Sequence, residues 1–192
     1  MPPKVKISRE DIIKTGIKLV RENGVGALNA RAIAASLNCS TQPIFSNFSS
    51  MKQLEEATGT AAYEIYLNKL QEEAKSEKYP RYKAFGMAYI RFASEEKELF
   101  KLLFMRDRSG EDTAPSPDFK ESVKMLREAN GISEEKAELM HLEMWSLVHG
   151  IAVMVATSFL SREWEIISKM TSDVYQGIRA RHIEEERKND SN

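Results

Sequence analysis

Four polar side chains stand close together in the chain, in a grouping that suits contacts with DNA. They are Thr41, Gln42, Ser46 and Asn47. Hydroxyl and amide groups of this reach hydrogen-bond to base edges and phosphates when the helix that carries them enters a major groove. If Ile44, Phe45 and Phe48 pack inward, the four polar side chains lie on the outer side of that helix. The segment therefore predicts a short recognition helix.

The residues just before this segment predict another helix and a tight turn. Asn29 is a suitable cap for that helix, because its side chain accepts a hydrogen bond from an early amide. The apolar face of the helix consists of Ile33, Ala34 and Leu37. Asn38 tolerates the left-handed conformation that ends a helix, Ser40 is expected to cap the next one, and Pro43 falls in its first turn. This pattern predicts a helix-turn-helix, although an ordinary corner between two helices remains an alternative.

A supporting helix is expected upstream of the pair. Ser8 and Asp11 have the spacing of a capping box, and Asn23-Gly24 is a stop signal. Gly16 lies inside the helix and costs it about 1 kcal/mol relative to alanine. We expect another backbone to approach closely at this glycine. Three helices packed in this way form a small DNA-binding domain.

The charge of the chain is divided unevenly. Eight basic and three acidic residues up to Gln53 give that part a net charge of +5, and the whole chain carries −1, so the remainder carries −6. A basic domain is suited to binding phosphates, because it releases their counterions. Arg31 and Lys52 are the expected phosphate contacts.

The stretch from Arg9 to Leu54 resembles the N-terminal domain of the TetR (tetracycline-repressor-like) family of bacterial regulators. The residues at the family's spacing are Ile12, Ile13, Leu19, Val20, Glu22, Asn23, Gly24, Arg31, Ala32, Ile33, Ala34, Leu37, Ser40, Phe48 and Leu54. The resemblance covers about a quarter of the chain. It implies an all-α protein with a DNA-binding domain over residues 1–53 and a helical ligand-binding and dimerisation domain over 54–192.

The sequence departs from the family pattern at four positions. The family usually has glycine at Asn38, tyrosine at Phe45, histidine at Asn47 and a phosphate-facing lysine at Met51. Lys52 and uncapped amides after Ser49-Ser50 are expected to hold a phosphate instead. The full set of expected DNA contacts is Arg31, Thr41, Gln42, Pro43, Phe45, Ser46, Asn47 and Lys52.

Composition excludes several other classes of protein. Charged residues make up 30% of the 192 residues, and only nine glycines and six prolines are present, which favours long helices. The single cysteine, Cys39, excludes an internal disulfide and offers no metal cluster. The TetR family prefers valine at this position, so the resemblance implies a buried, small apolar role for Cys39. The N-terminus has no hydrophobic signal region, which predicts a cytoplasmic protein. Because no phosphate-binding, nucleophile-elbow or metalloprotease motif occurs, we expect neither an enzyme nor a cofactor.

The remainder of the chain is expected to be helical throughout. A long helix is predicted from Met51 to about Lys78, another begins at Pro80, and a further one follows Ser94. The polar segment from Arg106 to Pro117 is the main expected surface loop. A short helix then ends at Asn130-Gly131, and the last two are predicted from Ser133 and from Arg162 to about Glu186.

The segment Met144–Leu160 is apolar on nearly every side. It is too short for a comfortable membrane span and contains Ser146 and His149, so we expect a buried helix and no membrane partner. A helix of this kind needs a neighbour beyond its own subunit, which predicts a homodimer. The last helix contributes a stripe formed by Trp164, Ile167, Met170, Val174 and Ile178. Residues 145–150 also resemble the tryptophan-x-x-x-histidine-glycine signature of one C-terminal domain class of the TetR family.

A ligand site is predicted where aromatic and methionine side chains gather, because such side chains suit apolar ligands. The candidates are Phe85, Tyr89, Phe92, Phe100, Phe104, Met140, Met144, Trp145 and His149. Each of them has an ordinary core role as its alternative. A metal site at His149 would need further ligands, with His141, Glu138 and Glu143 nearby, and we expect none.

These features together predict a DNA-binding transcriptional regulator. The resemblance implies a homodimeric repressor that binds a pseudo-palindromic double-stranded DNA operator and is released by a small, largely apolar ligand. The alternative is a helical protein–protein adaptor whose helix-turn-helix is vestigial, because the usual tyrosine hydroxyl and lysine are missing.

Overall fold

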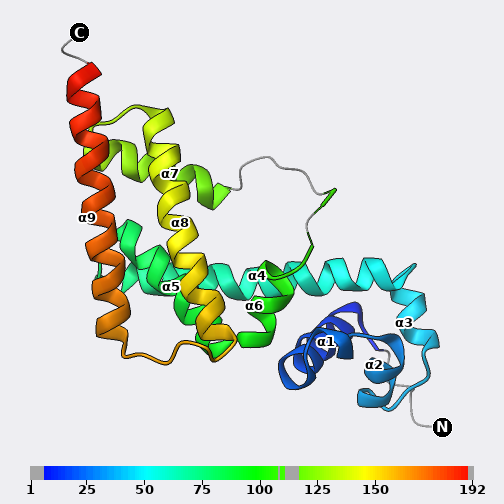
Figure 1. Ribbon diagram of the computed structural model, residues 1–192. Coiled ribbons are helices and arrows are strands. Elements are labelled where there is room, and N and C mark those ends of the chain that lie inside the picture. The colour runs from blue at the N-terminus through cyan, green and yellow to red at the C-terminus, as the bar shows by residue number, and fades with distance from the viewer. Residues whose placement is uncertain (1–6, 108, 111–116, 190–192) are drawn as a thin grey trace. The chain divides into compact units, whose positions relative to one another are not determined.

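The computed structural model describes residues 7–107, 109–110 and 117–189, and all of the regular structure in these residues is helical (Figure 1). Within these described residues it contains nine α-helices and one short 3-10 helix. They are α1 (Arg9–Asn23), η1 (Val25–Ala27), α2 (Ala30–Ser36), α3 (Gln42–Asn47), α4 (Met51–Lys75), α5 (Arg81–Glu95), α6 (Lys97–Phe104), α7 (Pro117–Asn130), α8 (Glu134–Ala156) and α9 (Trp164–Asn189). The predicted all-α fold is confirmed.

The chain forms two compact units. The first contains residues up to Lys69 together with Glu95–Asp107, and the second contains Leu70–Ser94 and the residues from 108 onward. The first unit thus adds part of α4 and all of α6 to the three predicted N-terminal helices. A domain boundary after residue 53 stays a prediction.

The core of the first unit is made by the apolar faces of α1 to α4 and α6. Its fully buried side chains include Ile12, Ile33, Ile44, Phe48, Leu54, Leu99 and Phe100. Gly16 allows a close approach, but of side chains rather than of a backbone: a Cβ there would lie 3.1 Å from atoms of both Leu28 and Thr58. Arg21, near the end of α1, makes two hydrogen bonds of 2.8 Å to the carboxylate of Glu96, which precedes α6. This pair ties together two segments that are 75 residues apart in the sequence.

The second unit is built on α5, α7, α8 and α9. Helix α8 packs against both α7 and α9, as Figure 1 shows. One cluster of its core contains Val123, Leu126, Ile132, Ala137 and Met140. Ser133 caps α8 by accepting a hydrogen bond from the amide of Lys136, and Gly131 takes the left-handed conformation after α7, so both predicted signals are confirmed.

Two expectations about helix lengths need correction. Helix α4 ends at Lys75, before the left-handed residue Glu77. Helix α8 begins at Glu134, as predicted from Ser133, but ends at Ala156, so the last residues of the apolar segment 144–160 lie beyond it. By length and composition α8 could cross a membrane, and the core helix of a soluble protein passes the same test. The main part of the expected loop at Arg106–Pro117 lies outside the described residues.

Candidate nucleic-acid interface

The turn between α2 and α3 has the predicted geometry. The side chain of Asn29 accepts a hydrogen bond of 2.9 Å from the amide of Ala32, which caps α2. Asn38 has a φ of 51°, in the left-handed region, and the amide of Cys39 donates to the carbonyl of Ala34 at 2.9 Å. These contacts reverse the chain within a few residues and place α3 directly after α2.

Helix α3 begins one residue later than expected. Thr41, and not Ser40, precedes the first helical residue, and its side chain makes no capping hydrogen bond. Pro43 lies in the first turn, as predicted. The proline ring fixes a helical φ and needs no amide partner there, so this helix can start without a side-chain cap.

The outer face of α3 is exposed and mainly polar. Gln42 and Ser46 are exposed, as are Arg31 on α2 and Lys52 on α4, whereas Thr41, Pro43 and Asn47 are half-buried. Ile44 and Phe48 are buried, as expected, but Phe45 is 51% exposed. The expectation that Phe45 packs inward is wrong: it lies about 100° around the helix from Ile44, at the edge of the buried face, and its ring stays largely in solvent.

Two of the polar side chains on α3 bond to the helix that carries them. The hydroxyl of Ser46 donates to the carbonyl of Gln42 at 2.9 Å, and the amide nitrogen of Asn47 donates to the carbonyl of Pro43 at 2.8 Å. Gln42 projects from the first turn as an exposed amide side chain. Of the four polar candidates, Gln42 is therefore placed best to reach a base edge.

Arg9 on α1 supports the end of α3, a role that was not predicted from the sequence. Its guanidinium donates to the carbonyl of Asn47 at 2.8 Å and lies 4.0 Å above the ring of Phe48. A positive charge at a helix C-terminus is favourable because it satisfies terminal carbonyls. The two residues are 38 positions apart, so no local pattern could have revealed this contact.

The start of α4 is capped rather than open. The amide of Gln53 donates to the hydroxyl of Ser50 at 3.2 Å, and the side chain of Gln53 accepts from the amide of Ser49 at 2.7 Å. The expected uncapped amides after Ser49-Ser50 are thus partly occupied within the chain. A phosphate at this end would depend mainly on the exposed side chain of Lys52.

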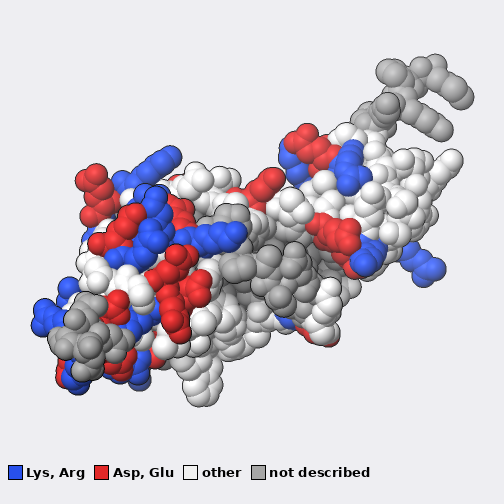
Figure 2. All heavy atoms as spheres, turned by 90° about the horizontal axis from the view of Figure 1, so that it is seen from above, with Lys and Arg blue, Asp and Glu red and all other residues white. Residues whose placement is uncertain are grey.

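Charges of both signs are mixed on the surface. Figure 2 shows Lys and Arg side chains interleaved with Asp and Glu on the face that it presents. On α1, Lys14 pairs with Glu10 at 2.7 Å, and Lys18 lies 3.9 Å from Glu22. Lys4 and Lys6, which contribute to the predicted positive charge, lie outside the described residues. The positive charge near α3 therefore rests on a few dispersed side chains.

In the second unit, α5 and α8 are linked by two tyrosine–histidine pairs. The hydroxyl of Tyr82 lies 3.0 Å from Nδ1 of His141, and that of Tyr89 lies 2.8 Å from Nδ1 of His149. Burial lowers the pKa of His141 to about 4 and also lowers the pKa of His149. Burial raises the pKa of Tyr82, so this hydroxyl stays protonated and can donate to a neutral imidazole.

The nine candidate ligand residues are divided between the two units. Phe100 and Phe104 belong to the first unit, where Phe104 packs on Tyr66 with ring centroids 5.2 Å apart. In the second unit Tyr89, Phe92, Met140 and Met144 are buried, and Phe85 and His149 are half-buried. Trp145 is 45% exposed and stacks on His149 at 5.0 Å between ring centroids. Among the second-unit candidates, Trp145 is the most exposed, and Phe85 and His149 are partly exposed.

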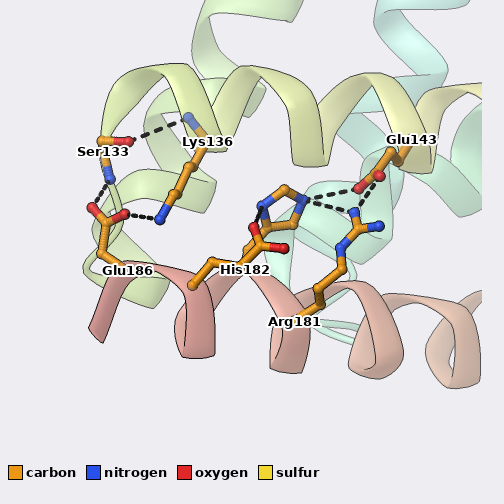
Figure 3. Close-up of polar contacts among 7 residues, drawn as sticks. Ser133, Lys136, Glu143, Arg181, His182 and Glu186 are labelled. Carbon is orange, nitrogen blue, oxygen red and sulfur yellow. Dashed lines mark hydrogen bonds and ion pairs between the residues drawn. The ribbon is translucent and has the colours of Figure 1, made fainter. Parts of the chain in front are cut away.

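A second polar cluster joins α8 and α9 and was not anticipated (Figure 3). His182 is buried, and its Nε2 lies 2.9 Å from the carboxylate of Glu143, which also pairs with Arg181. Burial opposes ionisation of Glu143, but the hydrogen bonds from Arg181 and His182 hold its pKa below the ordinary value. The partners lie 38 and 39 positions apart, beyond the reach of helical periodicity.

No group of three or more His, Cys, Asp or Glu side chains in the described residues is arranged to hold a metal ion. Cys39 is half-buried in the turn before α3.

Comparisons with known proteins agree with this architecture. Residues 82–166 match the family model described as the tetracyclin repressor-like C-terminal domain. A solved structure of a protein with unknown function from Rhodococcus sp. RHA1 is 19% identical, covers 95% of this chain and 100% of its own, and superposes with a TM-score of 0.72. A search of curated proteins found no match. The matched segment follows a helix-turn-helix, and this combination agrees with the resemblance to the TetR family of regulators.

Proposed function

We propose that this chain is a transcriptional regulator of the TetR family that binds double-stranded DNA through α3, acts as a homodimeric repressor and is released from its operator by a small, largely apolar ligand. The observation that carries the proposal is the position of Gln42 and Ser46, exposed on the outer face of α3 above the buried Ile44 and Phe48. A helix presented in this way after a tight turn is the reading element of a helix-turn-helix. Arg31 and Lys52 are exposed and supply the phosphate contacts.

Two exposed apolar stripes support the homodimer. Leu139 and Leu142 on α8 are 47–50% exposed, and Ile166, Met170 and Val174 on α9 are 38–44% exposed. The α9 residues recur every fourth position and so share one face. Apolar side chains grouped on neighbouring helices favour a symmetric contact with a second copy. Two-fold symmetry then places two recognition helices about 34–36 Å apart, or a multiple of this, on a pseudo-palindromic site.

The ligand proposal centres on Trp145 and His149. Their stacked rings offer an aromatic surface, and Nδ1 of His149 is bonded to Tyr89. A ligand that binds more tightly to the free protein than to the DNA-bound protein lowers the affinity for the operator. A preference of 1–3 kcal/mol lowers this affinity about 5–150-fold. Membership of the tryptophan-histidine-glycine class stays a prediction.

Selection of binding sites from random duplex DNA tests the DNA-binding function. Gln42→Ala should weaken binding to the selected site by roughly 1–3 kcal/mol and relax one position of it, and Asn47→Ala should do so less strongly because of its internal bond. Arg31→Ala should weaken binding to all DNA sequences alike and make the binding affinity less dependent on salt concentration. Lys124→Ala on α7 is the matched control for loss of a surface charge. Failure to bind duplex at both low and moderate salt would favour the adaptor.

A measurement of release from operator DNA tests the ligand proposal. A panel of hydrophobic and cationic compounds should contain one that raises the melting temperature and displaces operator DNA. Trp145→Ala should then alter the response with little loss of stability, whereas Phe92→Ala, at 0% exposure, should lower stability by about 3–5 kcal/mol. If no compound stabilises the protein or displaces DNA, the ligand proposal fails and the DNA-binding dimer remains.

A further inference from the structure

Phe45 is a large apolar side chain on the face of α3 that we assign to DNA. It is 51% exposed, and its neighbours on that face include the exposed Gln42 and Ser46. Exposing a phenylalanine forgoes the stabilisation that burial of its ring would give. The exposed ring is therefore available for a contact outside the chain.

The orientation of Phe45 is fixed by the residues around it. Ile44 is 0% exposed and Phe48 is 1% exposed, so α3 cannot rotate without exposing its core face. Arg9 holds the far end of α3 through the carbonyl of Asn47 and the ring of Phe48. A helix fixed at this register presents Phe45 outward in every conformation that keeps the core intact.

The polar side chains nearby are partly engaged in hydrogen bonds within α3, so an apolar contact can contribute to recognition. Ser46 and Asn47 each donate a hydrogen bond to a carbonyl of α3 itself, at 2.9 and 2.8 Å. These donors are already engaged, so base recognition by this part of the helix does not rest on them alone. An aromatic ring has no hydrogen-bonding group, and its natural target in a major groove is the C5-methyl group of thymine.

We propose that Phe45 is a specificity-determining residue that packs on a thymine methyl group in each operator half-site. This inference rests on the proposed DNA-binding function. It also predicts a property of the operator: each half-site contains a thymine whose methyl group, and not its hydrogen-bonding pattern, is required.

The test uses the full-length protein and an operator selected from random DNA. Each thymine is replaced in turn by uracil, which removes the methyl group and keeps every hydrogen-bonding group. One replacement per half-site should weaken binding of the wild-type protein about 4-fold, as expected for loss of one buried methyl-sized group. In Phe45→Ala this uracil effect should disappear. Phe45→Leu should retain part of it, because leucine still offers an apolar contact.

Gln42→Ala serves as the control, since it should weaken binding but keep the sensitivity to uracil. Thermal melts establish that the Phe45 variants are folded. The inference is overturned if no uracil replacement affects the wild-type protein, or if Phe45→Ala keeps the full effect; in both cases DNA binding itself stands. If the wild-type protein selects no site and binds no duplex at low salt, the proposed function fails as well.

Discussion

The helix-turn-helix and the α8–α9 pair distribute their polar and apolar groups in opposite ways. In α2 and α3 the buried side chains are apolar and the outer face is mainly polar, with Phe45 as its large apolar member. In α8 and α9 the buried side chains include His141, Thr171 and His182, while both helices expose apolar stripes.

This difference indicates two kinds of surface. A polar face over an apolar core is stable in water and can bind DNA without refolding. An apolar face over a core that contains hydrogen-bonded histidines gains stability when a second apolar surface covers it. The following predictions test whether the two regions differ in this way, from the largest expected effect to the smallest.

The sharpest contrast within the helix-turn-helix lies between two nearby phenylalanines. Phe48→Ala should lower the free energy of unfolding by about 3–5 kcal/mol, because it removes a buried ring and the surface on which Arg9 lies. Phe45→Ala should change it by no more than about 0.5 kcal/mol, as for an ordinary surface position. Urea unfolding of both variants measures the difference. Equal losses would mean that the outer face of α3 is part of a core.

The exposed stripes should matter for association and not for folding of the subunit. Leu142→Glu combined with Met170→Glu places like charges on both copies of the interface, which should raise the dissociation constant of the dimer about 100-fold or more. Sedimentation or light scattering over a concentration series measures this. Ala129→Glu, at an exposed position on α7, adds the same charge away from the stripes and should leave the dimer intact. A wild-type monomer at micromolar concentration would contradict the assignment.

The buried histidine of α8 should make stability depend on pH. The folded protein lowers the pKa of His141 from 6.5 to about 4, so below pH 6.5 the unfolded chain takes up a proton that the folded protein does not. Stability should therefore fall as the pH decreases, by roughly 2 kcal/mol between pH 8 and pH 5. His141→Asn, which keeps a hydrogen-bond acceptor near Tyr82, should remove this part of the pH dependence of stability. The same substitution at the half-buried His149 should have a smaller effect on the pH dependence of stability.

The smallest effect concerns a helix cap. Asn29→Ala removes the acceptor for the amide of Ala32 and should destabilise the helix-turn-helix by about 1 kcal/mol. Operator binding should decrease only in proportion to the unfolded fraction. Asn29→Asp is the control, because its carboxylate can accept the same hydrogen bond. A larger loss of DNA binding than of stability would show that Asn29 itself contacts DNA.

Local signals in the sequence predicted much of the first unit. The capping box at Ser8, the cap at Asn29 and the left-handed Asn38 each depend on residues within a few positions, and all three are confirmed. Phe45 was misplaced because an apolar side chain was assumed to be buried. The bond from Arg9 to Asn47 and the Glu143–His182 cluster join distant residues, so only the folded chain reveals them.

The hydrogen-bonded pair of Arg21 and Glu96 has a consequence for the synthesis of the protein. The first unit includes α6, whose Leu99 and Phe100 are fully buried, and the two members of the pair are 75 residues apart. At 5–20 residues per second, the ribosome adds the second member roughly 4–15 seconds after the first. During that interval the nascent α1 to α3 lack the helix that completes their core. The N-terminal helices are therefore made first but finish folding late, and a chain interrupted before α6 would expose apolar surface to chaperones and proteases.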